Sequence, residues 1–195
     1  MGPNAGPVRG AGLRHGWVRT ADGVYHDIDA IINLEGEYDV ETTDIEGDDQ
    51  LLAQFASLPT ATLSIVANSL SPSLFAAITG QTVTSVSTTG KKGQEVGLGG
   101  NGHANPPTVE VGGLTVGKLA HDDSAQTIKR IFHRVQLRTT SIPQEKDGEF
   151  NVTFEGLAFP TTKDITGSAL PDKRVETLGY TEQDVDSFIA EQDEE

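Results

Sequence analysis

Four carboxylates at alternate positions of a predicted strand form the first group that could do chemistry: Glu35, Glu37, Asp39 and Glu41. The other side of this strand carries the apolar residues Ile32, Leu34, Tyr38 and Val40. Paired carboxylates serve as acid and base in glycoside hydrolysis. Such enzymes normally add aromatic platforms for sugar rings, and aromatic residues make up only 6% of this chain. The alternation instead predicts a strand that buries its apolar face and presents an acidic face to water or to a lumen.

Histidine and carboxylate side chains, which suit several divalent cations, occur together at His121-Asp122-Asp123 and around His26. Their spacing favours a solvated turn and an exposed hairpin edge over a metal site. No G-x-S-x-G nucleophile elbow accompanies the many serine and aspartate residues. His133 falls among apolar positions of a predicted strand, which favours a hydrogen-bonded structural role over general-base catalysis. We therefore expect no enzymatic activity, no metal and no other cofactor.

A glycine-rich segment, residues 97–102, satisfies the G-x-G-x-x-G pattern of dinucleotide sites. Such a site needs a helix that begins at the last glycine. His103-Ala104-Asn105-Pro106-Pro107 follows instead and cannot open that helix. We interpret residues 90–105 as a long glycine-rich loop.

Charge and composition exclude several classes of protein. The formal charge of -15 and the pI near 4.6 oppose tight binding to a phosphate backbone, since each captured phosphate needs a lysine or arginine. The chain contains no cysteine and therefore no disulfide or zinc–cysteine site. No apolar run approaches the ~18 residues of a membrane span, and the N-terminus has no apolar signal core. We expect a soluble protein that is made in a cytoplasm and does not meet a membrane.

Strand patterns dominate the chain and predict a mainly β protein. They cover residues 17–20, 24–28, 31–45, 60–68, 81–89, 108–118, 125–140 and 150–159. Short helices are predicted at 50–56, capped by Asp48 or Asp49 and ended by Pro59, and at 71–80, with Ser71 as cap and Gly80 past the end. Thr181 and Asp184 form a capping box for a C-terminal helix that reaches residue 193.

The chain length of 195 residues suits one domain with extensions. Residues 1–16, rich in glycine and proline, predict a flexible N-terminal arm. Residues 17–162 predict an antiparallel β-sandwich or barrel with short flanking helices, and residues 163–195 a C-terminal extension with an acidic helix. Charge is unevenly distributed, because residues 22–49 contain no lysine or arginine whereas residues 128–138 carry only basic charge.

The order of several segments carries a family resemblance. They are Leu34-Glu35-Gly36-Glu37 with Glu46-Gly47-Asp48-Asp49, Ala61 to Asn68, Ile78-Thr79-Gly80, Pro106-Pro107, Phe132-His133-Arg134-Val135 and Gly148 to Gly156. Over residues 17–162 the chain resembles the major tail protein, or tail tube protein, of long non-contractile-tailed bacteriophages. Tubes of contractile tails and of secretion systems share that architecture and stay open as alternatives.

The resemblance implies a tail-tube type of β-sandwich with a flanking helix. It implies hexameric rings whose strands join into one inner barrel and which stack into a hollow tube. The partners would be further copies of the chain, the tape measure protein and the tail-end proteins. Assembly would take place in the host cytoplasm, the product would be the virion tail, and DNA would pass through it transiently during ejection.

Three sets of residues are candidates for this role. Lumen-facing acidic residues are Glu35, Glu37, Asp39 and Glu41, for which the outer surface is the competing position. Basic residues that pair with an adjacent subunit, or within the chain, are Lys129, Arg130, Arg134 and Arg138. Ring-stacking residues of the arm are Arg9 and Arg14, together with the loops in the 40s and at 90–105.

Two other classes of protein compete with the tube subunit. A virion decoration or host-carbohydrate adhesion module would share the β-sandwich, and it should present aromatic residues on exposed loops. A small hydrolase or metal-dependent enzyme is the third class, for which no convergent motif is present.

Overall fold

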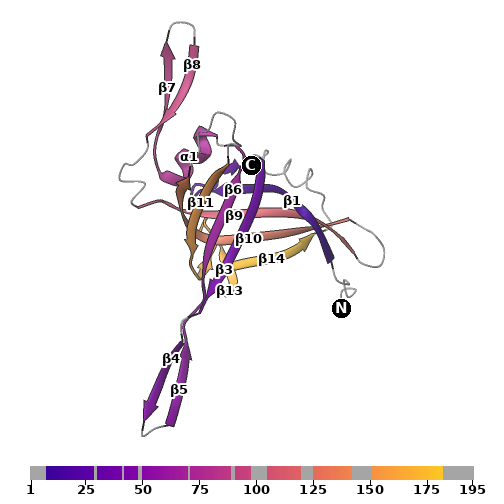
Figure 1. Ribbon diagram of the computed structural model, residues 1–195, viewed down its shortest axis with the longest axis vertical. Helices are drawn as coiled ribbons and strands as arrows, with labels where there is room; N and C mark the ends of the chain where they lie inside the picture. The colour runs from indigo at the N-terminus through magenta and orange to yellow at the C-terminus, as the bar shows by residue number, and fades with distance from the viewer. Residues whose placement is uncertain are drawn as a thin grey trace.

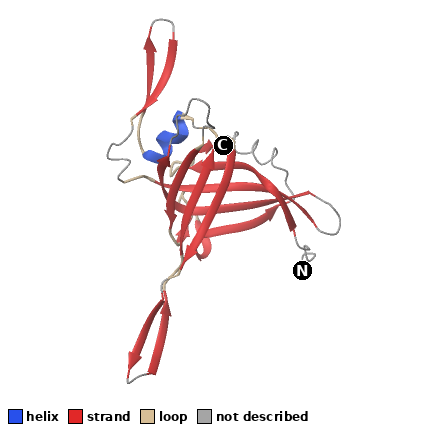
Figure 2. Cartoon of the chain, in the orientation of Figure 1, coloured by secondary structure: helices blue, strands red, loops and turns tan. Residues whose placement is uncertain are grey.

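The computed structural model describes residues 8–28, 30–40, 42–47, 50–69, 71–88, 91–97, 105–119, 125–141 and 151–181. Within them the protein is mainly β, and every paired strand is antiparallel (Figures 1 and 2). The elements are β1 (Val8–Arg19), β2 (Tyr25–Asp27), β3 (Ile31–Asp39), β4 (Thr42–Gly47), β5 (Gln50–Ala56), β6 (Thr60–Ala67), α1 (Pro72–Thr79), β7 (Val83–Thr88), β8 (Lys91–Val96), β9 (Thr108–Leu119), β10 (Ala125–Ser141), β11 (Val152–Ala158), β12 (Thr161–Lys163), β13 (Ala169–Arg174) and β14 (Glu176–Thr181).

The long strand β10 organises the main sheet, whose order is β2-β1-β9-β10-β11-β6-β3. β9 lies along one edge of β10, while β14 and then β11 occupy successive parts of its other edge. The register with β9 shifts between Phe132 and Val135, so β10 bends where it passes from β14 to β11. The sheet therefore folds over itself, and β3 and β6 cross the β9–β10 layer in Figure 1.

Close packing between the two layers depends on side chains of β3. Leu34 reaches Gly113 of β9, where a Cβ atom would lie 2.8 Å from Leu34 Cδ2. Gly36 lies over Phe132 of β10, and a Cβ there would be 2.7 Å from Phe132 Cζ. The core between the layers contains Val18, Ile28, Leu63, Ile65, Val109, Val111, Phe132, Val135, Leu137, Phe154 and Val175, together with Leu74, Phe75 and Ile78 of α1.

The structure confirms several elements that the sequence predicts. In β6 the alternate residues Ala61, Leu63, Ile65 and Ala67 are buried. Ser71 Oγ accepts a hydrogen bond from the Leu74 amide at the start of α1, and Gly80 ends the helix with a φ of 67°. The Asp22-Gly23 turn connects β1 to β2, and β10 pairs with β11.

The helix predicted over residues 50–56 is wrong, because these residues form β5. They pair with β4 from Thr42↔Ala56 to Gly47↔Gln50. A helix of two turns has little intrinsic stability, whereas β4 offers a full row of backbone hydrogen bonds. The glycine-rich loop predicted from residue 90 likewise contains β8, which pairs with β7. Both hairpins project from the body at opposite ends of its long axis (Figure 1).

Both predicted extensions differ from the structure. From Val8 onward the expected arm belongs to β1, which pairs with β9 between Val8↔Leu119 and Arg19↔Glu110. Backbone hydrogen bonds to a neighbouring strand order this segment despite its few apolar side chains. Past residue 162, β14 pairs with β10, so the sheet extends to Thr181. Thr181 ends that strand, and the remainder of the predicted C-terminal helix lies outside the described residues, as do residues 1–7.

Candidate assembly surface

Four adjacent strands, β3, β6, β11 and β10, present one mostly polar face to solvent, here named the outer face. Its exposed or half-buried side chains include Glu35, Glu37, Asp39, Thr62, Ser64, Glu155, Leu157, Arg134, Gln136 and Arg138. The strand register places them in rows, one of which runs Glu35, Ser64, Glu155 and Arg138. Glu155 and Arg138 are direct cross-strand neighbours of opposite charge, a pairing that stabilises a sheet.

The acidic alternation on β3 is confirmed for three of its four carboxylates. Glu35, Glu37 and Asp39 are exposed, whereas Glu41 lies outside the described residues. The predicted apolar face of Ile32, Leu34, Tyr38 and Val40 is mostly wrong. Only Leu34 packs against the core, whereas Ile32, Tyr38 and Val40 are 53%, 46% and 48% exposed. The register shift between Ile31 and Asn33 turns Ile31 inward in place of Ile32.

Strand β3 is the last strand of the main sheet. Among the described strands it pairs only with β6, so its other edge makes no ladder there. An unpaired edge carries backbone donors and acceptors that can pair with another chain. The charged residues along β3 suit a strand that meets water or a matched partner. This edge therefore offers backbone groups to a strand of another chain.

The basic residues predicted on β10 fall into two environments. Arg130 Nε makes an ion pair with Glu176 Oε2 at 2.9 Å, and the Arg130 guanidinium lies over the Phe132 ring. Lys129 is half-buried beside Trp17, and burial lowers its pKa; Glu110 opposes this shift and Arg19 adds to it. Arg134 and Arg138 are exposed on the outer face. Arg130 is therefore paired within the chain, whereas Arg134 and Arg138 are accessible to solvent.

Phe132 and His133 are both buried, but they lie on opposite faces of β10, as the alternation predicts. Phe132 packs in the core between the layers, whereas His133 lies on the other face with Glu110 and Thr177. The bulge between Phe132 and Val135 then places Val135 in the same core as Phe132. His133 Nδ1 lies 3.2 Å from Glu110 Oε2, and its Nε2 lies 2.7 Å from Thr177 Oγ1. His133 and Glu110 are only 5% and 4% exposed. The predicted hydrogen-bonded structural histidine is confirmed, and it links β9, β10 and β14.

A second polar cluster, which sequence reasoning missed, links the two layers. Tyr38 of β3 lies beside Arg130 and Glu176, and its pKa is raised to about 12. Burial is the largest cause, followed by the hydrogen bond and the charge of Glu176, while Arg130 acts in the opposite direction. The sequence separation between β3 and β14 gives no signal for this contact. Tyr38 thus connects the acidic strand to the C-terminal strand of the sheet.

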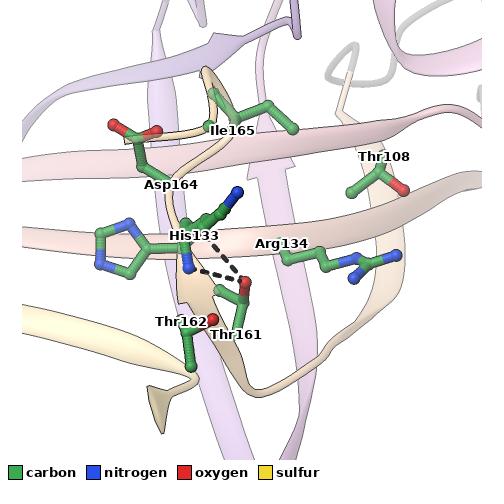
Figure 3. Close-up of a pocket in the computed structure, with 9 residues that line it drawn as sticks. Thr108, His133, Arg134, Thr161, Thr162, Asp164 and Ile165 are labelled. Carbon is green, nitrogen blue, oxygen red and sulfur yellow. Dashed lines mark hydrogen bonds between the residues drawn. The ribbon is translucent and has the colours of Figure 1, made fainter. Parts of the chain in front are cut away.

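A cleft of about 410 Å³ opens between β10 and the turn after β12 (Figure 3). Thr108, Arg134, Thr162 and Lys163 line it, and Arg134 and His133 point in opposite directions. Thr161 Oγ1 donates to the Lys163 carbonyl and accepts from the Lys163 amide. Asp164 Oδ1 accepts from the amides of Thr166 and Ser168. These oxygens serve the turn itself, so the cleft holds no nucleophile and base in contact among its described residues.

Other predicted candidates contribute less to this surface. Arg9 and Arg14 both lie in β1, and Arg14 is exposed. His121 to Asp123, and most of the 97–102 segment, lie outside the described residues. In the described part of the chain, no group of three or more His, Asp or Glu side chains is arranged to hold a metal. None of the described helices has the length and apolar character to cross a membrane.

Comparisons with known proteins leave the family open. The chain matches no protein-family model, and no curated protein is significantly similar to it.

Proposed function

We propose that this chain is the structural subunit of a hollow tube of the kind found in long non-contractile bacteriophage tails. One observation carries the proposal: the part of the main sheet with the mostly polar outer face, β10-β11-β6-β3, ends in the acidic strand β3, whose far edge pairs with no described strand. Joining such sheets edge to edge removes the free edges and closes a barrel across subunits. The rings, of six subunits by family resemblance, then stack into the tube.

In this arrangement the outer face of the sheet becomes the wall of the bore. Glu35, Glu37 and Asp39 would face the passing DNA, and their charge would repel its phosphates. The chain would act without enzymatic chemistry and without a cofactor. Its partners would be its own copies, the tape measure protein and the tail-end proteins, in a virion tail assembled in the host cytoplasm.

The competing function is a decoration or carbohydrate-adhesion module. The cleft beside Arg134 offers hydroxyl and charged groups to a sugar. Among the described residues that line it there is no Trp, Tyr or Phe side chain, although sugar-binding sites commonly use an aromatic platform. The free edge of β3 has no role in that alternative, so the tube subunit accounts for more of the structure.

Electron microscopy of the purified protein at high concentration, with light-scattering mass, tests the proposal. We expect rings or tubes with a central hole. Ile32→Lys places a charge on the exposed edge strand and should reduce ring formation at least about tenfold without unfolding the chain. Val24→Lys is the matched control, because Val24 is a similarly exposed apolar residue (48%) outside the ladder of β3.

The proposal is contradicted by a wild-type protein that stays monomeric with and without a tail initiator complex. It is also contradicted if Ile32→Lys assembles as readily as Val24→Lys. Circular dichroism and thermal unfolding of both variants confirm that any loss of rings does not reflect loss of fold.

A further inference from the structure

Two hairpins project from the body at opposite ends of its long axis (Figure 1). The β4–β5 hairpin lies between β3 and β6 in the chain, and the β7–β8 hairpin follows α1. Each forms its own two-stranded sheet, and no third described strand joins either of them. Isolated two-stranded hairpins are marginally stable in water. Both are therefore suited to gain stability by packing against another molecule.

The two hairpins carry opposite charge. Residues 42–56 contain four acidic residues, Asp44, Glu46, Asp48 and Asp49, and no basic residue. Residues 83–96 contain Lys91 and Lys92 at the start of β8, with Glu95 as the only acidic residue. No lysine or arginine occurs anywhere from residue 20 to residue 90. The basic pair thus stands at one end of the molecule and the acidic hairpin at the other.

A hollow of about 660 Å³ lies against the basic hairpin. Pro72 at the start of α1 forms one wall, and Val86, Lys92 and Gln94 contribute to the other. Lys92 is exposed beside it. Ser85 and Ser87 also line the hollow, so apolar and polar groups stand next to an exposed ammonium group. Such a hollow fits a hairpin whose sequence combines apolar and acidic residues. The sequences of β4 and β5 have that composition, with Ile45, Leu51, Asp44 and Glu46.

We infer that the β4–β5 hairpin of one copy docks against the β7–β8 hairpin and its hollow on the next copy. This inference rests on the proposed tube function and assigns the contact between successive rings. The acidic residues of one hairpin would pair with Lys91 and Lys92 of the other. Because the two surfaces differ and lie at opposite ends, the contact is head-to-tail and repeats in one direction. The assembly would be a polar tube rather than a closed pair of rings.

Changing the charge of each hairpin provides the test. Lys91→Glu with Lys92→Glu makes both hairpins acidic, and Asp44→Lys with Glu46→Lys offsets Asp48 and Asp49, so that the β4–β5 hairpin carries no net charge. Each variant alone should form rings but at least about tenfold fewer sedimenting tubes, because the first variant sets like charges against each other and the second removes the net charge opposite Lys91 and Lys92.

Lys163→Glu with Lys173→Glu is the matched control for the lysine variant, since both lysines are exposed away from the hairpins and the net charge falls equally. Asp27→Lys with Asp172→Lys, at exposed positions of β2 and β13, raises the net charge as much as the Asp44/Glu46 variant does and is its control.

A complementation arm makes the test specific. Mixing preformed rings of the two variants in equal amounts should restore part of the tubes, because the acidic hairpin of the Lys91/Lys92 variant can then dock against the unchanged Lys91 and Lys92 of the Asp44/Glu46 variant. In the proposed assembly exposed ion pairs dominate the stacking contact but not the contacts within a ring. High salt should therefore dissociate the wild-type tubes before it disrupts the rings.

The outcomes separate this contact from the tube function itself. If the two hairpin variants form tubes as readily as their controls, or if the mixture fails to restore tubes, the hairpin contact is wrong and the ring proposal stands. If the wild type forms no rings under any condition, the tube function is contradicted and the contact with it.

Discussion

Tyr38 shows how one residue can join parts of the chain that are far apart in sequence. Its ring belongs to the acidic strand β3, yet its hydroxyl group responds to Glu176 of β14 and Arg130 of β10. It is also 46% exposed, so the contact is partly solvated and its energy is reduced by screening. The cluster fixes the crossing of the two layers near the edge that we propose to join subunits.

The raised pKa of Tyr38 makes stability depend on pH in the alkaline range. A tyrosine whose folded-state pKa is about 12 favours the neutral form relative to the unfolded chain, where the value is 10.0. Its contribution to stability is therefore complete below pH ~10 and is lost as pH rises towards ~12. Spectrophotometric titration should show a tyrosine that ionises near pH 12. Tyr38→Phe should remove that late step, and its persistence in this variant would contradict the assignment.

At the scale of the element, two glycines in the strands beside β10 differ in whether an added methyl side chain would fit. Gly112 of β9 faces Trp17, which is 1% exposed, and a Cβ there would overlap the indole ring. Gly179 of β14 has no atom within 4 Å of the position of a Cβ. Both glycines pair with the same stretch of β10, at Ile131 and Lys129.

These two glycines give a matched prediction on stability. Gly112→Ala should lower the free energy of unfolding by about 1–3 kcal/mol, because the buried Trp17 must shift to admit the new methyl group. Gly179→Ala should change it by less than about 0.5 kcal/mol, since the added methyl group meets open space. Urea unfolding of both variants measures the difference. Equal effects at the two positions would show that the β1–β9 packing is looser than described.

At the scale of the whole molecule, the outer face and the two hairpins define three directions of contact. Strand β3 ends the main sheet with an edge that pairs with no described strand, and the hairpins extend at opposite ends of the molecule (Figure 1). In the proposed tube the chain closes laterally and repeats axially. The outer face, on which Glu35, Glu37, Asp39 and Glu155 outnumber Arg134 and Arg138, would then become a continuous surface whose net negative charge is multiplied by the number of subunits.

That multiplied charge yields a prediction about DNA. Glu37→Lys with Asp39→Lys should leave the fold and the tubes intact, because both residues are exposed. If they line the bore, the variant tubes should retain duplex DNA at low salt and slow its ejection, and the retention should fall steeply as salt rises. Asp27→Lys with Asp172→Lys makes the same charge change at exposed positions of β2 and β13. Normal ejection through Glu37/Asp39 variant tails would exclude the lumen position.

Local sequence patterns determined much of the strand content. Alternation predicts β6 and the acidic face of β3, and capping residues predict α1, because side-chain period and terminal hydrogen bonds are local properties. Acidic and polar positions of the outer face follow from the same alternation in β3 and β11. Composition also predicts the separation of charge between residues 22–49 and 128–138.

Only the tertiary structure decided which backbone groups found a partner. Residues 50–56 form β5 because β4 lies beside them, and residues 8–16 form a strand because β9 offers an edge, although neither segment has a strong local signal. The bulge at Ile31–Asn33 leaves Ile32 exposed, and the bulge in β10 leaves Val135 on the same buried side of its strand as Phe132. Such a one-residue shift reverses the face of every side chain that follows it. The Tyr38 cluster, the buried His133–Glu110 pair and the unpaired edge of β3 depend on strands distant in sequence, so no local pattern could contain them.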